Sequence, residues 1–122
     1  MIYEMRTYTL NVGGVAEFEE NFGKVIEKRH EMSPLIGFFH SEIGDLNRVM
    51  HIWSYKDAGE RQKVRAALPD LPGWPPQNAH LIQDQVTKLM TAPPFRAEPR
   101  QGALGGVYEV RTYTMQIGKA GE

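Results

Sequence analysis

The order of strand-like and helix-like segments constrains the fold of this chain more than any other feature. Residues 2–10 are rich in Tyr, Thr and Met and contain neither Gly nor Pro, a composition that favours a strand. From Val15 the apolar residues recur with a period of 3.6, which predicts a helix that ends near Ser33-Pro34. The later elements are a hairpin of strands 36–43 and 48–55 around a four-residue turn, a helix capped by Asp57 that runs to about residue 68, and a strand at 85–91.

This order of strand, helix, strand, strand, helix, strand is the split βαβ or ferredoxin-like pattern of the α+β class. Its two helices cover one face of a four-stranded sheet, and an apolar face on the other side needs burial of its own. Pro93, Pro94 and Pro99 follow the last strand. We therefore expect the domain to occupy residues 1–97 and residues 98–106 to form a linker.

The first strand is repeated near the end of the chain. Tyr3-Glu4-Met5-Arg6-Thr7-Tyr8-Thr9 recurs as Tyr108-Glu109-Val110-Arg111-Thr112-Tyr113-Thr114, identical at six of seven positions. The spacing equals one complete unit plus its linker, which predicts that residues 107–122 are the first strand of a truncated second repeat. Because an isolated strand cannot satisfy its backbone groups, we expect residues 107–115 to pair with a neighbouring chain.

Composition limits the possible partners and compartments. The chain has 122 residues, a net charge of -1 and no cysteine. The near-neutral charge gives no basic footprint for nucleic acid or an anionic membrane, and the missing thiols exclude disulfides and cysteine nucleophiles. No apolar run reaches the length of a membrane span, and no dinucleotide, phosphate-loop or EF-hand motif is present. We expect a cytoplasmic protein with neither nucleic acid nor membrane as partner and without a cofactor.

Several motifs in order resemble the NIPSNAP family. They are the strand Tyr3–Tyr8, the run Gly37–Asn47, the stretch His51-Ile52-Trp53-Ser54-Tyr55, the helix with Asp57, Glu60, Arg61 and Arg65, and Trp74 beyond it. The resemblance covers about residues 1–97. It implies a dimeric α/β barrel in which two ferredoxin-like units join their open sheet faces. It therefore implies a homodimer or a multiple of dimers.

Side-chain alternation along the strands predicts which residues share a face. A four-residue turn at 44–47 would place His40 opposite His51, Phe38 opposite Trp53 and Glu42 opposite Val49. The alternate face, with Phe39, Met50 and Ile52, is mostly apolar and is expected beneath the helices. The open face is then predicted to carry Glu4, Arg6, Tyr8, Phe38, His40, Glu42, His51, Trp53 and Tyr55.

His40 and His51 are the candidate catalytic residues on that open face. Three interpretations remain: hydrogen-bonded histidines at a dimer interface, which we favour; a general acid/base pair; and metal ligands joined by Glu42 or Glu4. The site prediction includes no metal.

The candidate substrate-binding residues are Glu4, Arg6, Tyr8, Trp53 and Tyr55. An inward Arg6 could hold a carboxylate, although a structural ion pair with a strand neighbour explains it more simply. Two function classes follow: a binding or assembly module for a small metabolite or a protein, and, as the alternative, a cofactor-independent enzyme resembling a monooxygenase or lyase. A deep cavity lined by His40, His51 and Arg6 would favour the enzyme, and a filled barrel would favour the module.

Overall fold

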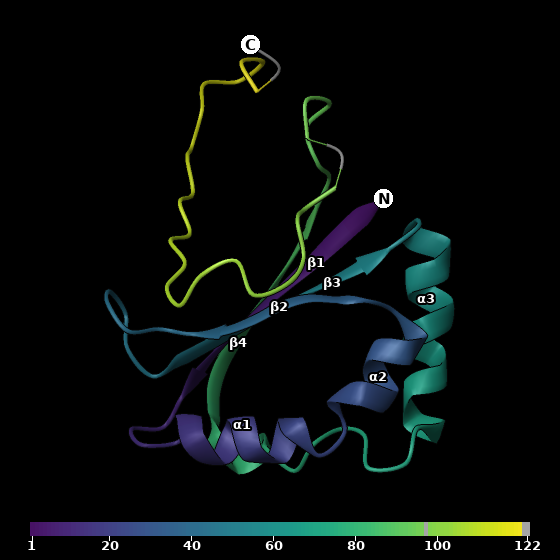
Figure 1. Cartoon of the computed structure of the whole chain (residues 1–122), viewed down its shortest axis with the longest axis vertical. Helices are drawn as coiled ribbons and strands as arrows, with labels where there is room; N and C mark the ends of the chain where they lie inside the picture. Colours follow the sequence, from purple (N-terminus) through teal and green to yellow (C-terminus); the bar gives the residue numbers. More distant parts are fainter. Residues whose placement is uncertain (97, 121–122) are drawn as a thin grey trace.

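A four-stranded antiparallel sheet with helices on one face forms the ordered part of the molecule (Figure 1). The computed structural model describes residues 1–96 and 98–120. The elements are β1 (Ile2–Leu10), α1 (Val15–Gly23), α2 (Ile26–Met32), β2 (Leu35–His40), β3 (Arg48–Tyr55), α3 (Ala58–Ala67), the 3₁₀ turns η1 (Leu68–Asp70) and η2 (Ala79–Leu81), and β4 (Ile82–Met90). The strand order β2-β3-β1-β4 confirms the ferredoxin-like α+β prediction.

The predicted first helix is divided into α1 and α2. The division follows Gly23, a weak helix former, and Val25 leaves helical geometry with φ −124°. Because the two helices have separate axes, α1 can bury Phe18 and Phe22 while α2 buries Arg29 in the same layer. The capping prediction for α3 is confirmed, since the Asp57 side chain accepts a hydrogen bond from the Glu60 amide at 2.8 Å.

The register of the β2–β3 hairpin differs from the prediction by two residues. Phe38 lies opposite His51, and His40 lies opposite Val49. The reason is that β2 ends at His40 and the connection begins at Ser41, whose amide donates to the Arg48 carbonyl at 3.0 Å. The prediction that His40 and His51 oppose each other is therefore wrong. A two-residue shift keeps each strand side chain on its face, so the members of the predicted group that lie in strands still share one face, while Glu42 lies beyond the end of β2.

The prediction that this group lies on the open face of the sheet is wrong, because the helices cover the face that carries it. Tyr8, Trp53 and Tyr55 belong to the same buried cluster as Phe18 and Phe22 of α1. Aromatic rings from the sheet and from α1 contact one another, as between Tyr8 and Phe18, whose centroids are 5.4 Å apart. Glu4 on this face is buried with them and pairs with Arg61 and Arg65 of α3. The face opposite the helices carries Met5, Phe39, Met50 and Ile52.

The segment after β4 lies over that opposite face (Figure 1). The ring of Tyr108 lies 5.0 Å from that of Phe39. Residues 107–115 form no strand within the single chain, so their addition to a neighbouring chain stays a prediction. The predicted domain boundary at residue 97 and the end of the predicted repeat at 121–122 lie outside the described residues. Within the described part of the chain, no helix has the length and apolar character needed to cross a membrane.

Candidate functional site

A cavity of about 280 Å³ lies on the helix-covered side of the sheet. Aromatic side chains form much of its wall, namely Tyr8, Phe18, Phe22, Trp53 and Trp74. Ionisable side chains from β1, α2, β3 and α3 complete it. The cavity therefore combines apolar ring faces with a small number of charged groups, as small-molecule sites do.

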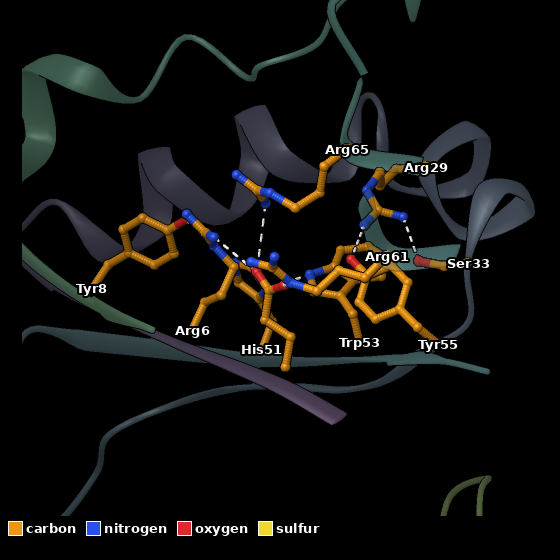
Figure 2. Close-up of polar contacts among 10 residues, drawn as sticks. Arg6, Tyr8, Arg29, Ser33, His51, Trp53, Tyr55, Arg61 and Arg65 are labelled. Atoms are coloured by element: carbon orange, nitrogen blue, oxygen red, sulfur yellow. Dashed lines mark hydrogen bonds and ion pairs between the residues drawn. The ribbon is translucent and has the colours of Figure 1, made fainter. Parts of the chain in front are cut away.

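Glu4 is the central carboxylate of the site, and its side chain is fully buried. It accepts hydrogen bonds from Arg6 Nη1 at 2.8 Å and from Arg61 Nε, while Arg65 Nη1 lies 3.5 Å away (Figure 2). Burial alone would raise the pKa of Glu4, but hydrogen bonds from Arg6 and Arg61 outweigh it and hold the pKa below its usual value. Glu4 is thus an ionised anchor for guanidinium groups.

Arg6 continues this network along β1. Its Nε donates to the Tyr8 hydroxyl at 2.9 Å while Nη1 donates to Glu4. Residues two apart on a strand share a face, which brings the three side chains into one row. The structural ion pair expected for Arg6 is formed with Glu4 of the same strand, and it lies in the wall of the cavity.

Arg29 is a buried cation on α2, with 1% of the residue exposed. It donates from Nη1 to Ser33 Oγ at 2.7 Å and from Nη2 to the Tyr55 hydroxyl at 2.8 Å (Figure 2). Its guanidinium carbon lies 4.0 Å from the ring centroid of Trp53. Among the described residues no carboxylate lies within ion-pair distance of Arg29, and its Nε has no hydrogen-bond partner. A buried cation without a counter-ion is costly, and burial lowers the pKa of Arg29 from its usual value.

His51 supplies a second unpartnered donor to the same cavity. Its Nδ1 accepts a hydrogen bond from Trp53 Nε1 at 2.7 Å, and indole nitrogen can only donate, so the proton of the neutral ring is on Nε2. Nε2 is buried and has no partner in the described part of the chain. Burial, and then the charges of Arg6 and Arg29, lower the pKa of His51 to about 3. At neutral pH the ring is an uncharged hydrogen-bond donor.

The lowered pKa of His51 predicts a specific loss of stability in acid. The His51 ring takes up a proton near pH 6.5 in the unfolded chain, but only near pH 3 in the folded chain. The stabilising effect of the neutral ring is therefore complete above pH 6.5 and is lost as pH falls toward 3, at about 1.4 kcal/mol per pH unit. Between pH 6.5 and 4 we expect about 3 kcal/mol of the free energy of unfolding to be lost through His51 alone.

Urea denaturation across this pH range measures the effect. His51→Phe should remove the uptake of about one proton from the pH dependence of the free energy of unfolding, so that this dependence becomes shallower. The stability of the variant at pH 7 should be lower, because the Trp53 indole loses its acceptor. NMR titration of the His51 ring provides an independent check. A ring that titrates near pH 6.5 in the folded protein would contradict the burial described above.

The predicted site residues are only partly brought together. Glu4, Arg6, Tyr8, His51 and Trp53 line the cavity. Tyr55 lies beside it as the acceptor for Arg29.

The prediction that His40 belongs with this group is wrong. Its side chain is 41% exposed, and its two ring nitrogens contact Glu19 at 2.6 Å and Glu42 at 3.0 Å, which raises its pKa. The metal interpretation needs His40, His51 and a carboxylate side by side, and no group of three or more potential metal ligands occurs among the described residues.

Sequence reasoning missed Arg29, Arg65 and Trp74 as cavity residues. The signal for Arg29 was its position on the apolar stripe of Phe18, Phe22 and Ile26, where a charged residue needs a reason to be buried. Arg61 and Arg65 of α3 both contact Glu4 of β1. That contact spans more than fifty residues of sequence, so spacing alone could not reveal it.

The comparison with known sequences identifies relatives that are longer than this chain. The sequence model of the NIPSNAP family matches residues 3–96. Protein NipSnap homolog 3B of Homo sapiens is 35% identical over 121 residues, which is 95% of this chain and 49% of the relative. Protein NipSnap homolog 1 of Danio rerio is 38% identical over 92 residues, 73% of this chain and 33% of the relative. The chain thus spans about half of the first relative and a third of the second.

Solved structures agree with this assignment. A protein from Agrobacterium tumefaciens is 33% identical, with a TM-score of 0.73 over 78% of this chain and 96% of its own. A NIPSNAP domain protein from Burkholderia xenovorans is 26% identical, with a TM-score of 0.74 over 80% of this chain and 100% of its own. An antibiotic biosynthesis monooxygenase shares the fold alone, at 19% identity and a TM-score of 0.61 over 77% of this chain and 100% of its own. The family match, the curated relatives and the shared fold lead to one conclusion: this chain belongs to the NIPSNAP family.

Proposed function

We propose that this domain is a binding module for a small organic anion, which it holds in the cavity between the sheet and the helices. The observation that carries the proposal is Arg29, a buried cation without an acidic partner in the described part of the chain. Such a charge is destabilising unless something compensates it. A carboxylate in the adjoining cavity would supply the missing negative charge.

The unpartnered donors favour a ligand with acceptor oxygens. Arg29 Nε–H and His51 Nε2–H are both buried, and both residues line the cavity. A buried donor without an acceptor costs about 1–3 kcal/mol. A carboxylate offers two acceptor oxygens to such donors, whereas an apolar ligand offers none.

The surroundings of these donors favour an aromatic ligand of modest size. The rings of Trp53, Trp74 and Phe22 provide flat apolar surface for stacking. The volume of about 280 Å³ lies at the lower end of the range for small-molecule pockets. Three guanidinium groups line it, those of Arg6, Arg29 and Arg65, together with one carboxylate, that of Glu4. This excess of positive charge favours an anion.

The alternative, a cofactor-independent enzyme acting on a small organic substrate, has one observation in its favour. The cavity contains His51 and Arg6, two of the three residues that the enzyme interpretation requires. However, Nδ1 of His51 is occupied by the Trp53 indole and the pKa of the ring is lowered to about 3, so it is a poor general base at neutral pH. His40 lies in the exposed contacts with Glu19 and Glu42. These features support binding over turnover.

Calorimetric titration with benzoate tests the proposal, with benzamide as its uncharged analogue. Benzoate is expected to bind at least tenfold more tightly, because a charge-assisted hydrogen bond contributes about 1.5–3 kcal/mol. Arg29→Met should abolish this preference while keeping the volume of the aliphatic stem. Arg48→Met is the matched control, since Arg48 pairs with Asp45 at the exposed hairpin. Equal binding of both probes, or unchanged benzoate affinity in Arg29→Met, would overturn the proposal.

We also propose that the domain forms a homodimer through the sheet face opposite the helices. Met5, Phe39 and Met50 give that face its apolar character. The helices do not cover it, and the segment after β4, which does lie over it, would have to share it with the partner (Figure 1). A groove of about 260 Å³ beside these apolar residues is lined by Tyr3, Ile36, Ile52 and Met90. A dimer at micromolar concentration in sedimentation equilibrium is the expected result, and a monomer would count against it.

A further inference from the structure

Two arginines on α3 contact the same carboxylate in different ways. Arg61 and Arg65 are one helical turn apart, and both approach Glu4 of β1. Arg61 makes a short contact through Nε, and it is not among the described residues that line the cavity. Arg65 lies 3.5 Å from Glu4 and does line the cavity. The first residue is therefore an anchor, and the second is only loosely held.

Glu4 does not depend on Arg65 for compensation. Arg6 at 2.8 Å and Arg61 already donate to its two oxygens. The Arg65 contact lies at the limit of a hydrogen bond, and its side chain is 39% exposed, against 1% for the whole of Arg29. Judged by exposure, Arg65 marks the mouth of the cavity, and the buried residues Arg29 and His51 mark its inner end.

A ligand with a single acidic group would leave Arg65 without a negatively charged partner on the ligand. If a monoanion binds against Arg29 and His51, Arg65 keeps only its 3.5 Å contact with Glu4, whose oxygens already accept from Arg6 and Arg61. Like charges repel, so Arg65 lowers the pKa of Arg29, although this effect is smaller than those of burial, Tyr55 and Glu4. A second negative group near Arg65 would reduce that repulsion.

We propose that the ligand is a small aromatic acid with two negatively charged groups, and that Arg65 is the residue that selects the second charge. One acidic group accepts hydrogen bonds from Arg29 and His51 at the buried end. The other accepts from Arg65 at the mouth, after Arg65 releases Glu4 to Arg6 and Arg61. This inference rests on the proposed function of the cavity. It adds that the ligand carries two negative charges and that Arg65 binds the second one.

The test compares ligands that differ in one carboxylate. Benzoate and the three benzenedicarboxylates are titrated by calorimetry into the full chain, its Arg65→Gln variant and its Arg61→Gln variant. At least one dicarboxylate is expected to bind wild-type protein ten times more tightly than benzoate does. Arg65→Gln should reduce that ratio to about one. Arg61→Gln should lower the melting temperature but keep the ratio.

Each other outcome counts against the inference. If no dicarboxylate binds more tightly than benzoate, or if Arg65→Gln keeps the tenfold ratio, Arg65 does not select a second charge. Benzoate binding would then still support the proposed function by itself. If neither benzoate nor any dicarboxylate binds, the proposed function and this inference both fail.

Discussion

Glu4→Gln is expected to reduce the free energy of unfolding by about 3–5 kcal/mol, which is the usual effect of breaking a buried ion pair. The glutamine amide would face Arg6, Arg61 and Arg65 with no negative charge between them. Urea denaturation at pH 7 measures the change. The wild-type contribution should be present above about pH 4.5 and lost as pH falls through the lowered pKa of folded Glu4.

The repeated strand sequence provides a matched control for this variant. Glu109 lies in the repeated segment, which differs only in having Val110 where the first strand has Met5. It pairs with Arg111, as Glu4 pairs with Arg6, but its side chain is 67% exposed. Glu109→Gln should therefore change the free energy of unfolding by no more than about 0.5 kcal/mol, as exposed pairs do. If Glu4→Gln and Glu109→Gln reduce the free energy of unfolding by the same amount, the buried network around Glu4 does not stabilise the domain as described.

Trp53→Ala is expected to lower the free energy of unfolding by about 3–5 kcal/mol. The ring is 1% exposed, lies under the Arg29 guanidinium and donates to His51, so its removal leaves a cavity and deprives both residues of a contact. Trp74→Ala, at a half-buried position in the loop after α3, should cost clearly less. Because Trp53 faces the helices, the association of folded Trp53→Ala protein should match that of wild type. A selective loss of the dimer would contradict this placement.

Much of the fold follows from patterns in the sequence. The strands, their order and the cap at Asp57 come from alternation, turn residues and helical period, which are local properties. Membership of one face also follows from alternation, so Glu4, Arg6, His51 and Trp53 were grouped correctly. The choice of which face the helices cover does not follow, because both faces carry apolar side chains.

The candidate site was less predictable because its contacts are not local. Burial of Glu4 depends on arginines of α3, and the shape of the cavity depends on Trp74 in an irregular loop. The register error at His40 arose because the residues just after it resemble strand but form the connection to β3. The unpartnered nitrogens of Arg29 and His51 become visible only when every neighbour has been placed.

The most direct test of the anion-binding cavity is NMR observation of the Arg29 Nε–H and His51 Nε2–H protons during a benzoate titration. If the cavity holds the carboxylate, both signals should shift downfield and saturate with the dissociation constant from calorimetry, because both protons gain an acceptor. The Arg48 side chain at the hairpin should show no such saturating shift. Signals of Arg29 and His51 that stay unchanged while benzoate binds elsewhere, or no binding at all, would contradict the assignment of this cavity.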